Sequence, residues 1–280
     1  MKSDLIIHHD IESYIQSVTD FLESAEAENG LLLGNLERLR ADSPAVRPFM
    51  AQVVAEGRTV CVAYYRDRNL LISRGPEGIW KQIARKLLEE GFVIPGVVGP
   101  SNDAERLAAE WVDLRRCGSE LAMNQRVYQL VTVSPPSGIP GGARLVRDGD
   151  IETLKLWMTG FYQDAIPWEM PSAGEVLEAV KARIPAGLTY LWEMDGKPVA
   201  MTALSRPTRR GFTVNAVYTP PEYRKRGYAS ALVAAVSSEG LNRGKEFCVL
   251  YTDLSNPTSN SIYQKIGYKP VCDSRHYRFS

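Results

Sequence analysis

Apolar positions in the first half of the chain follow a helical period and then change to strand-like runs. Residues 10–40 predict two consecutive helices, because Ile11, Ile15 and Val18 recur three or four positions apart and leucines repeat after Asn29. The other elements predicted for this half are strands at 59–65 and 69–73, a helix at 79–90, a strand at 92–98, a helix at 103–114 and an extended segment at 121–133.

The second half repeats this order more clearly. The predicted elements are helices at 150–162 and 173–183, strands at 189–193 and 198–204, a strand at 212–219, a helix at 227–243, a strand at 247–252, a helix at 257–266 and a strand at 275–279. Asp195-Gly196 suits a tight hairpin turn between two of these strands. Both halves therefore end in β-α-β-α-β, which predicts an α/β protein that arose by duplication.

A proline- and glycine-rich stretch separates the halves. Residues 133–142 contain three prolines and three glycines, which exclude a continuous helix or a central strand. The predicted organisation is a domain over residues 1–133, a linker over 134–142 and a second domain over 143–280.

Composition agrees with two folded units. The chain has 280 residues, 44% apolar and 24% charged, as in ordinary globular proteins. Lysine plus arginine equals aspartate plus glutamate at 33 each, so no net field attracts nucleic acid or a membrane surface, and neither is expected as a partner. From Arg144 onward basic residues outnumber acidic ones 18 to 14, whereas the preceding residues hold 15 and 19, a modest bias that suits a phosphate-bearing ligand.

The four cysteines are far apart and form no Cys-x-x-Cys pair, so no metal site and no disulfide framework are expected. Apolar runs are far shorter than the roughly 20 residues that cross a bilayer, and the first ten residues lack the apolar core of a secretory signal. A cytoplasmic location is the expectation.

The segment 217–232 carries the most informative chemistry. A predicted strand meets Pro220-Pro221, continues into a basic turn and enters a helix near Gly227. The first amides of a helix lack intrahelical partners and lie at the positive end of its dipole, so they can bind a phosphate. The residues expected to offer these amides or positive charge are Arg224, Lys225, Arg226, Gly227, Tyr228, Ala229 and Ser230. A solvated basic helix start is the alternative interpretation of the turn taken alone.

Two motifs together resemble one protein family. Arg224-Lys-Arg-Gly-Tyr-Ala229 resembles the pyrophosphate loop of the GNAT superfamily of acyl-CoA-dependent N-acyltransferases, Arg/Gln-x-x-Gly-x-Gly/Ala. Further along, Asn256-Pro-Thr-Ser-Asn-Ser-Ile-Tyr-Gln-Lys-Ile-Gly-Tyr268 is similar to the family's second motif. The resemblance covers residues 143–280 and implies two tandem GNAT-like α/β domains, each a mixed twisted sheet flanked by helices, with acetyl-CoA as co-substrate. The N-terminal copy is expected to be degenerate, because residues 70–79 and 101–115 lack both motifs.

The resemblance also implies roles for individual residues. Asn260 would hydrogen-bond the pantetheine arm, and the Tyr263 hydroxyl would protonate the departing thiolate. The backbone around Tyr218, at Val217 and Thr219, would pair with the pantetheine amides as an extra strand. For Asn256 a helix cap and a ligand contact are both open, and for Tyr263 the alternative is a buried core aromatic.

One departure from the family pattern concerns the general base. Many members carry a glutamate on the strand that here contains Thr213, Val214 and Asn215. The candidates that remain are a water relay or a carboxylate from elsewhere, namely Asp164, Glu169 or Glu193.

The expected function is therefore an N-acetyltransferase that moves an acetyl group from acetyl-CoA directly to an amine of a small molecule or peptide. A non-catalytic acyl-CoA-binding sensor or scaffold is the alternative, favoured by the missing glutamate. Aromatic residues at 157–168 and the tail 275–279 fit an acceptor pocket or core packing equally. The sequence leaves a homodimer open.

Overall fold

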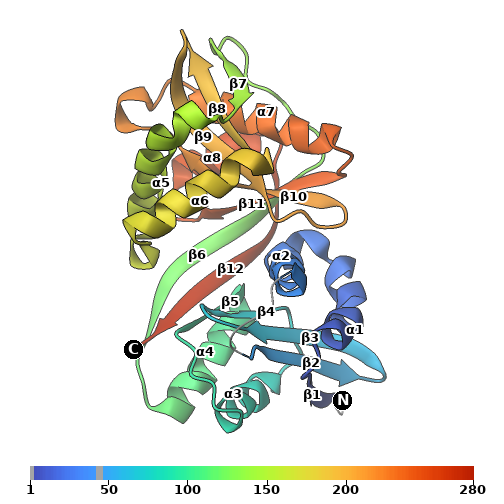
Figure 1. Ribbon diagram of the computed structural model, residues 1–280. Helices are drawn as coiled ribbons and strands as arrows, with labels where there is room; N and C mark the ends of the chain where they lie inside the picture. Colours follow the sequence, from blue (N-terminus) through green and yellow to red (C-terminus); the bar gives the residue numbers. More distant parts are fainter. Residues whose placement is uncertain (1–2, 42–46) are drawn as a thin grey trace. The chain divides into compact units, whose positions relative to one another are not determined.

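The computed structural model describes residues 3–41 and 47–280, which form two compact units (Figure 1). Unit 1 comprises Met1–Tyr128, Tyr251–Pro257 and Pro270–Ser280, and unit 2 comprises Gln129–Leu250 and Thr258–Lys269. Within the described ranges no helix is long and apolar enough to cross a membrane.

Unit 1 is a mixed sheet with helices on both faces. Its elements are β1 (Ser3–Ile7), α1 (Ile11–Ser24), α2 (Glu26–Ala41), β2 (Phe49–Ala55), β3 (Arg58–Tyr65), β4 (Leu70–Ile72), α3 (Ile79–Glu89), β5 (Gly96–Pro100), α4 (Ser101–Arg115), β6 (Ser119–Leu130) and β12 (Lys269–Phe279). The strand order is β1-β2-β3-β4-β5-β12-β6. One core cluster packs α3 and α4 against the sheet around Trp80 and Trp111, and a second packs α1 and α2 around Tyr14 and Leu36.

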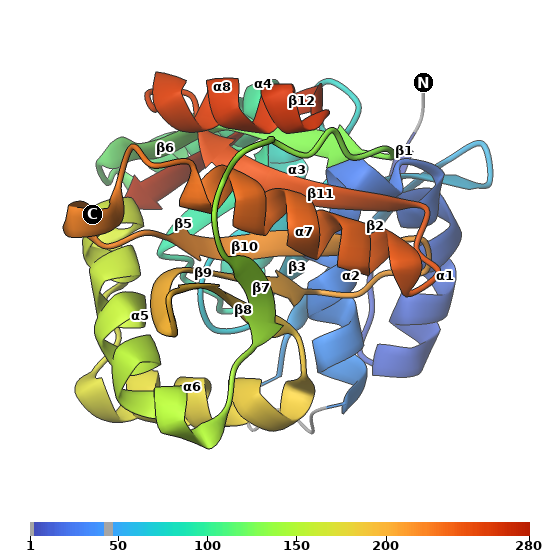
Figure 2. The same ribbon diagram turned by 90° about the horizontal axis from the view of Figure 1, so that it is seen from above.

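Unit 2 has the same layered plan. Its elements are β7 (Gly142–Leu145), η1 (Asp148–Asp150), α5 (Ile151–Ala165), η2 (Pro167–Glu169), α6 (Ala173–Ala186), β8 (Thr189–Met194), β9 (Lys197–Ser205), β10 (Gly211–Tyr218), η3 (Pro221–Tyr223), α7 (Tyr228–Asn242), β11 (Phe247–Asp253) and α8 (Pro257–Ile266). The strand order is β11-β10-β9-β8-β7. Viewed from above, α5 and α6 lie on one side of β8, β9 and β10, and α7 lies on the other (Figure 2).

The division into compact units differs from the predicted contiguous domains. The last strand of the chain, β12, belongs to unit 1, where Ser274–Arg278 pairs antiparallel with Gly96–Pro100 of β5. The predicted linker 134–142 lies inside unit 2 and is held there by two hydrogen bonds. The Ser134 amide donates to the Ile266 carbonyl at 2.7 Å, and Trp192 Nε1 donates to the Pro140 carbonyl at 2.9 Å. Proline and glycine set the local conformation of this segment, but long-range strand pairing sets the unit boundary.

The sequence pattern did not predict three of the strands. β2 is buried along nearly its whole length and so lacks the alternation that marks a half-exposed strand. β1 and β7 are short edge strands of five and four residues, too brief for a periodic signal. The other predicted elements agree with the structure to within a few residues, except that β5 begins four residues later than expected and β12 is longer.

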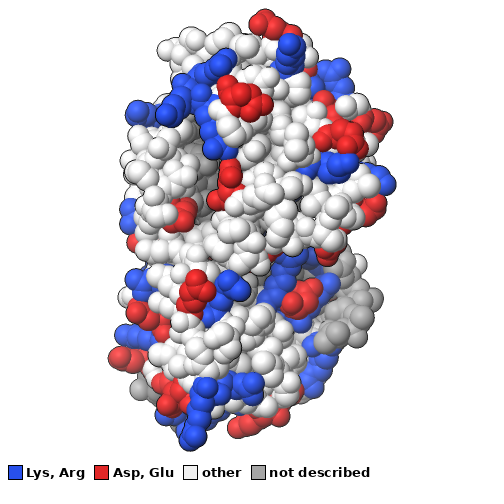
Figure 3. Space-filling model, turned by 90° about the vertical axis from the view of Figure 1, so that its left-hand side faces the viewer, with Lys and Arg blue, Asp and Glu red and all other residues white. Residues whose placement is uncertain are grey.

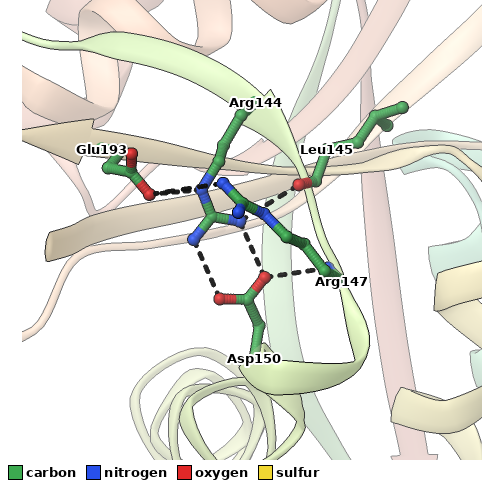
Figure 4. Close-up of polar contacts among 5 residues, drawn as sticks. All are labelled: Arg144, Leu145, Arg147, Asp150 and Glu193. Carbon is green, nitrogen blue, oxygen red and sulfur yellow. Dashed lines mark hydrogen bonds and ion pairs between the residues drawn. The ribbon is translucent and has the colours of Figure 1, made fainter. Parts of the chain in front are cut away.

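A cluster of charged groups joins β7, η1 and β8 in unit 2 (Figure 4). Arg144 donates to both carboxylate oxygens of Asp150, at 2.7 and 2.9 Å, and its Nε donates to Glu193 at 2.5 Å. The Arg147 amide adds a third donor to Asp150 at 2.8 Å. The side chains of Arg144 and Asp150 are only 19% and 11% exposed, so this bidentate pair is shielded from water.

We expect Arg144→Met to destabilise unit 2 by about 3 kcal/mol, because it leaves the buried Asp150 carboxylate without its cation. Chemical denaturation of the full chain measures this loss. Lys155→Met is the matched control, because Lys155 and Glu152 form an exposed pair one helical turn apart, and its loss should cost less than about 0.5 kcal/mol. Equal effects of the two substitutions would contradict a structural role for the Arg144 cluster.

The same cluster predicts a pH dependence. The Arg144 guanidinium holds the pKa of Asp150 below its usual value, so the stability that Asp150 contributes is full above about pH 4 and is lost as the pH falls through the lowered pKa. Melting temperatures measured between pH 7 and pH 2 should therefore fall more steeply for the parent protein than for Arg144→Met. Parallel curves would contradict this assignment.

Candidate functional site

The central feature of unit 2 is a parallel strand pair that stays together over only a few residues. β10 pairs with β11 over Gly211–Thr213 and Phe247–Val249, and among the described residues the ladder ends there while β10 continues to Tyr218. The edge of β10 beyond Thr213 is thus open to pairing with an extended ligand. Val217, Tyr218 and Thr219, predicted to bind pantetheine through the backbone, lie on or just after this stretch.

A bulge distorts the same stretch of β10. The register with β9 shifts between Asn215 and Tyr218, and Ala216 adopts a left-handed backbone with φ of +50°. Thr202 of β9 fixes the bulge by donating to the Asn215 carbonyl at 2.9 Å. Bulges redirect backbone groups and are common next to active sites.

The basic turn after β10 has the backbone of an anion-binding loop. Lys225 and Gly227, on either side of Arg226, adopt left-handed conformations with φ of +63° and +82°. Such alternation directs successive N–H groups into one concavity. Gly227 is also the N-cap of α7 and supplies no side-chain cap, so the amides of Tyr228, Ala229 and Ser230 stay available. These residues fit a pyrophosphate.

Arg224 supports the turn through contacts with neighbouring elements of unit 2. Its Nε donates to the Thr219 carbonyl at 2.9 Å, its Nη2 donates to Asp164 of α5 at 2.7 Å, and its guanidinium lies over the Tyr218 ring at 5.9 Å. The Tyr218 hydroxyl in turn packs closely on Gly160 of α5. Arg224 therefore connects the turn to α5 as well as adding positive charge.

The proline- and glycine-rich segment reaches the same turn. A Cβ at Gly227 would lie 2.5 Å from Ile139 Cδ1, so the Ile139 side chain covers the Gly227 backbone. No sequence signal indicated this contact, because Ile139 lies almost ninety positions before Gly227.

The second motif forms α8, as predicted. Asn260 and Tyr263 lie one turn apart on the helix within unit 2, whereas Asn256 precedes the helix in the segment Tyr251–Pro257 of unit 1. Tyr263 is 8% exposed and packs edge-on against Tyr268, and burial raises the pKa of its hydroxyl to about 12. The hydroxyl therefore stays protonated at neutral pH.

Two of the three carboxylates considered as general base are already engaged. Glu193 accepts from Arg144 and Asp164 accepts from Arg224. Glu169 lies in the short η2 turn between α5 and α6. Aromatic residues were the candidates for acceptor binding. Trp157 of α5 packs in the core of unit 2, and the tail 275–279 belongs to unit 1.

Unit 1 contains an equivalent turn with opposite charge. Helix α3 begins after Gly78, whose φ of +84° nearly equals that of Gly227. The preceding residue is Glu77, where unit 2 has Arg226. Arg74 is paired with Glu28 at 2.5 Å, and Asp103 accepts a hydrogen bond from the Gly75 backbone. These carboxylates disfavour a pyrophosphate in unit 1.

Charge elsewhere is evenly mixed. Figure 3 shows Lys and Arg interspersed with Asp and Glu over the face that it draws. Among the described residues no group of His, Cys, Asp and Glu could hold a metal ion.

Comparison with known proteins identifies the fold of this site. Residues 151–268 match the Acetyltransferase (GNAT) family. This part of the chain is a GNAT acetyltransferase domain. The family transfers acyl groups from acyl-CoA to amine acceptors. No curated protein matches the chain.

Solved structures of similar proteins extend the likeness to the full chain. A Drosophila protein has a TM-score of 0.68 at 14% identity and covers 100% of this chain and 99% of its own. A GCN5-related N-acetyltransferase from Sphaerobacter thermophilus has a TM-score of 0.63 at 16% identity, covering 98% and 95%. A tandem GNAT protein from the clavulanic acid biosynthesis pathway has a TM-score of 0.54 at 11% identity, covering 100% and 98%. The predicted tandem GNAT-like α/β fold is confirmed.

The geometry of the turn predicts the effect of substituting its glycine. We expect Gly227→Val to abolish CoA binding measured by calorimetry, because a branched side chain strains the left-handed backbone and collides with Ile139, which displaces the turn.

Gly78→Val is the matched control for Gly227→Val. It imposes the same backbone strain at the start of α3, where a Cβ meets no other atom within 4 Å, and it should leave CoA affinity unchanged. Intact CoA affinity in Gly227→Val would exclude this turn as the site.

Proposed function

We propose that the protein is an N-acetyltransferase that transfers the acetyl group of acetyl-CoA directly to an amine of a small molecule or peptide. The observation that carries the proposal is the presence in unit 2 of three features. β10 is left open beyond Thr213, an anion-binding turn follows it at Lys225–Gly227, and Tyr263 lies on α8. In open α/β sheets ligands bind at the carboxyl ends of the strands, where this turn lies.

Different residues would bind different parts of acetyl-CoA. The amides of Gly227 to Ser230 and the charges of Lys225 and Arg226 would hold the pyrophosphate. The β10 backbone from Val217 to Thr219 would pair with the pantetheine, and Asn260 would hydrogen-bond the same arm. Held in this way, the thioester carbonyl lies against the bulge at Ala216, whose redirected N–H groups can stabilise an oxyanion.

The proposed reaction is a direct transfer between two bound molecules. The neutral amine attacks the thioester carbonyl carbon, a C–N bond forms and the C–S bond breaks. The amine nitrogen loses one proton to water, because Asp164 and Glu193, two of the three candidate carboxylates, are engaged with arginines. The thiolate takes a proton from the Tyr263 hydroxyl, which regains one from solvent.

The raised pKa of Tyr263 defines its part in this step. A phenol with a pKa of about 12 donates a hydrogen bond at every working pH, and it gives up its proton only to a leaving group that has already gained charge. Tyr263 would therefore assist departure of the thiolate late in the reaction.

A non-catalytic acyl-CoA sensor remains the second candidate, because β10 carries Asn215 and no glutamate on the stretch that faces α5. Release of free thiol from acetyl-CoA in the presence of a broad panel of amines separates the two functions. CoA binding without thiol release would favour the sensor.

Tyr263→Phe should keep acetyl-CoA affinity and lower kcat by about 10²- to 10⁴-fold, because it removes one hydroxyl and retains the ring. Calorimetry and thiol release measure the two quantities separately.

Tyr268→Phe is the matched control for Tyr263→Phe. Its buried hydroxyl bonds Ser237 at 2.8 Å, so its loss should cost about 1 kcal/mol of stability and leave kcat near that of the parent. A Tyr263→Phe variant that turns over within about twofold of the parent would assign Tyr263 to the core.

A further inference from the structure

Three residues of unit 2 form a row across the sheet at the level of the bulge. Thr189 of β8 pairs with Ala203 of β9, and Ala203 pairs with Asn215 of β10. Directly paired residues of antiparallel strands project to the same face. This face is the one covered by α5 and α6, because Leu191 and Met201, two positions along from Thr189 and Ala203, share a core cluster with Leu154 of α5.

At one end of the row lies a half-buried cation without a counter-ion. Arg183 follows Val176 and Val180 on the inner side of α6, and its Nη1 reaches the Thr189 hydroxyl at 3.5 Å. Its Nε is buried without a hydrogen-bond partner, and in the described parts of the chain no carboxylate pairs with it. Burial lowers the pKa of the guanidinium, yet arginine remains charged. An unpaired buried charge costs stability and so calls for an explanation.

At the other end of the row lies a buried acceptor without a donor. Asn215 Oδ1 is buried and has no hydrogen-bond partner, although the Asn215 backbone carbonyl is paired with Thr202. Ala203 between the two ends contributes only a methyl group. Two strand spacings, about 10 Å, separate the backbones of Thr189 and Asn215, and the side chains shorten this gap.

The Arg183 guanidinium is a hydrogen-bond donor and Asn215 Oδ1 is an acceptor, so one small molecule that has an acceptor at one end and a donor at the other can bind both. Arginine in a buried site binds carboxylates through two parallel hydrogen bonds, and the Asn215 oxygen accepts from an N–H group. Asn215 lies on the stretch of β10 where the thioester would be held, so the N–H group would be the reacting amine.

We propose that the acceptor is a small free amino acid, whose carboxylate binds Arg183 and whose amine is held at Asn215. This proposal rests on the proposed acyl transfer and narrows its substrate class. It also accounts for the unpaired, half-buried Arg183 of α6, since the substrate supplies the missing anion.

The test compares acids with their neutral amides. The full-length protein with acetyl-CoA is given glycine, β-alanine and 4-aminobutanoate, each beside its carboxamide, and kcat/KM is measured by thiol release. We expect the best acid to exceed its amide by about 10- to 100-fold, the range for a charged hydrogen bond. Arg183→Met should reduce that ratio to about one while leaving kcat/KM for the amide within about twofold.

Two further variants separate binding from structure. Lys181→Met removes an exposed cation, 52% accessible, from the same helix and should keep the ratio. Asn215→Ala should lower turnover of acid and amide by the same factor, because both share the amine. The melting temperature of Arg183→Met should equal or exceed that of the parent, since an uncompensated, half-buried charge is removed. A lower melting temperature with equal losses for acid and amide would overturn the proposal in favour of a core role.

Calorimetry of the same acids, added to CoA-saturated protein, distinguishes failure of this proposal from failure of the acyl transfer. Equal use of acids and amides would overturn the amino-acid acceptor and leave the acyl transfer standing. Binding of an acid that requires Arg183, without any turnover, would support the site and contradict the transfer. Absence of both binding and turnover for every acid would overturn the amino-acid acceptor.

Discussion

The early end of the β10–β11 ladder is the constraint on which the site depends. Were the two strands paired along their full length, β10 would offer no free backbone edge and the bulge at Ala216 would have no function. The bulge also changes the direction of β10 before the basic turn, because Ala216 has a left-handed backbone. The end of the β10–β11 ladder, the bulge at Ala216 and the basic turn follow one another along the chain. The proposed use of the bulge and of the open β10 edge requires that the ladder ends after Thr213.

The two units show that backbone geometry alone does not make an anion site. Gly78 and Gly227 begin their helices with almost the same backbone angle. Around Gly78 the residues are Glu77, a paired Arg74 and Asp103, whereas around Gly227 they are Lys225 and Arg226. Because a pyrophosphate carries charge as well as shape, electrostatics favours unit 2 as the proposed pyrophosphate site.

Local sequence predicted the helices, most strands and the two motifs, because these depend on periodicity and on short spacings. It did not reveal that β12 pairs with β5, since that contact joins residues about 180 positions apart. It also missed the contact of Ile139 with Gly227 and the partners of Asp164 and Glu193. Arg183 went unnoticed for a different reason: a lone arginine on a predicted helix is normally solvated, and only the burial of its Nε without a partner distinguishes it.

The chain path enters and leaves the helix that carries Tyr263 through strands. Helix α8, which carries Tyr263, follows the unit 1 segment Tyr251–Pro257 and leads into the unit 1 segment Pro270–Ser280. Strand β11 therefore precedes this helix and strand β12 follows it. A hydroxyl that must meet a leaving group needs a helix that is held in place, and strands paired in a sheet on both sides of α8 restrict the movement of its ends.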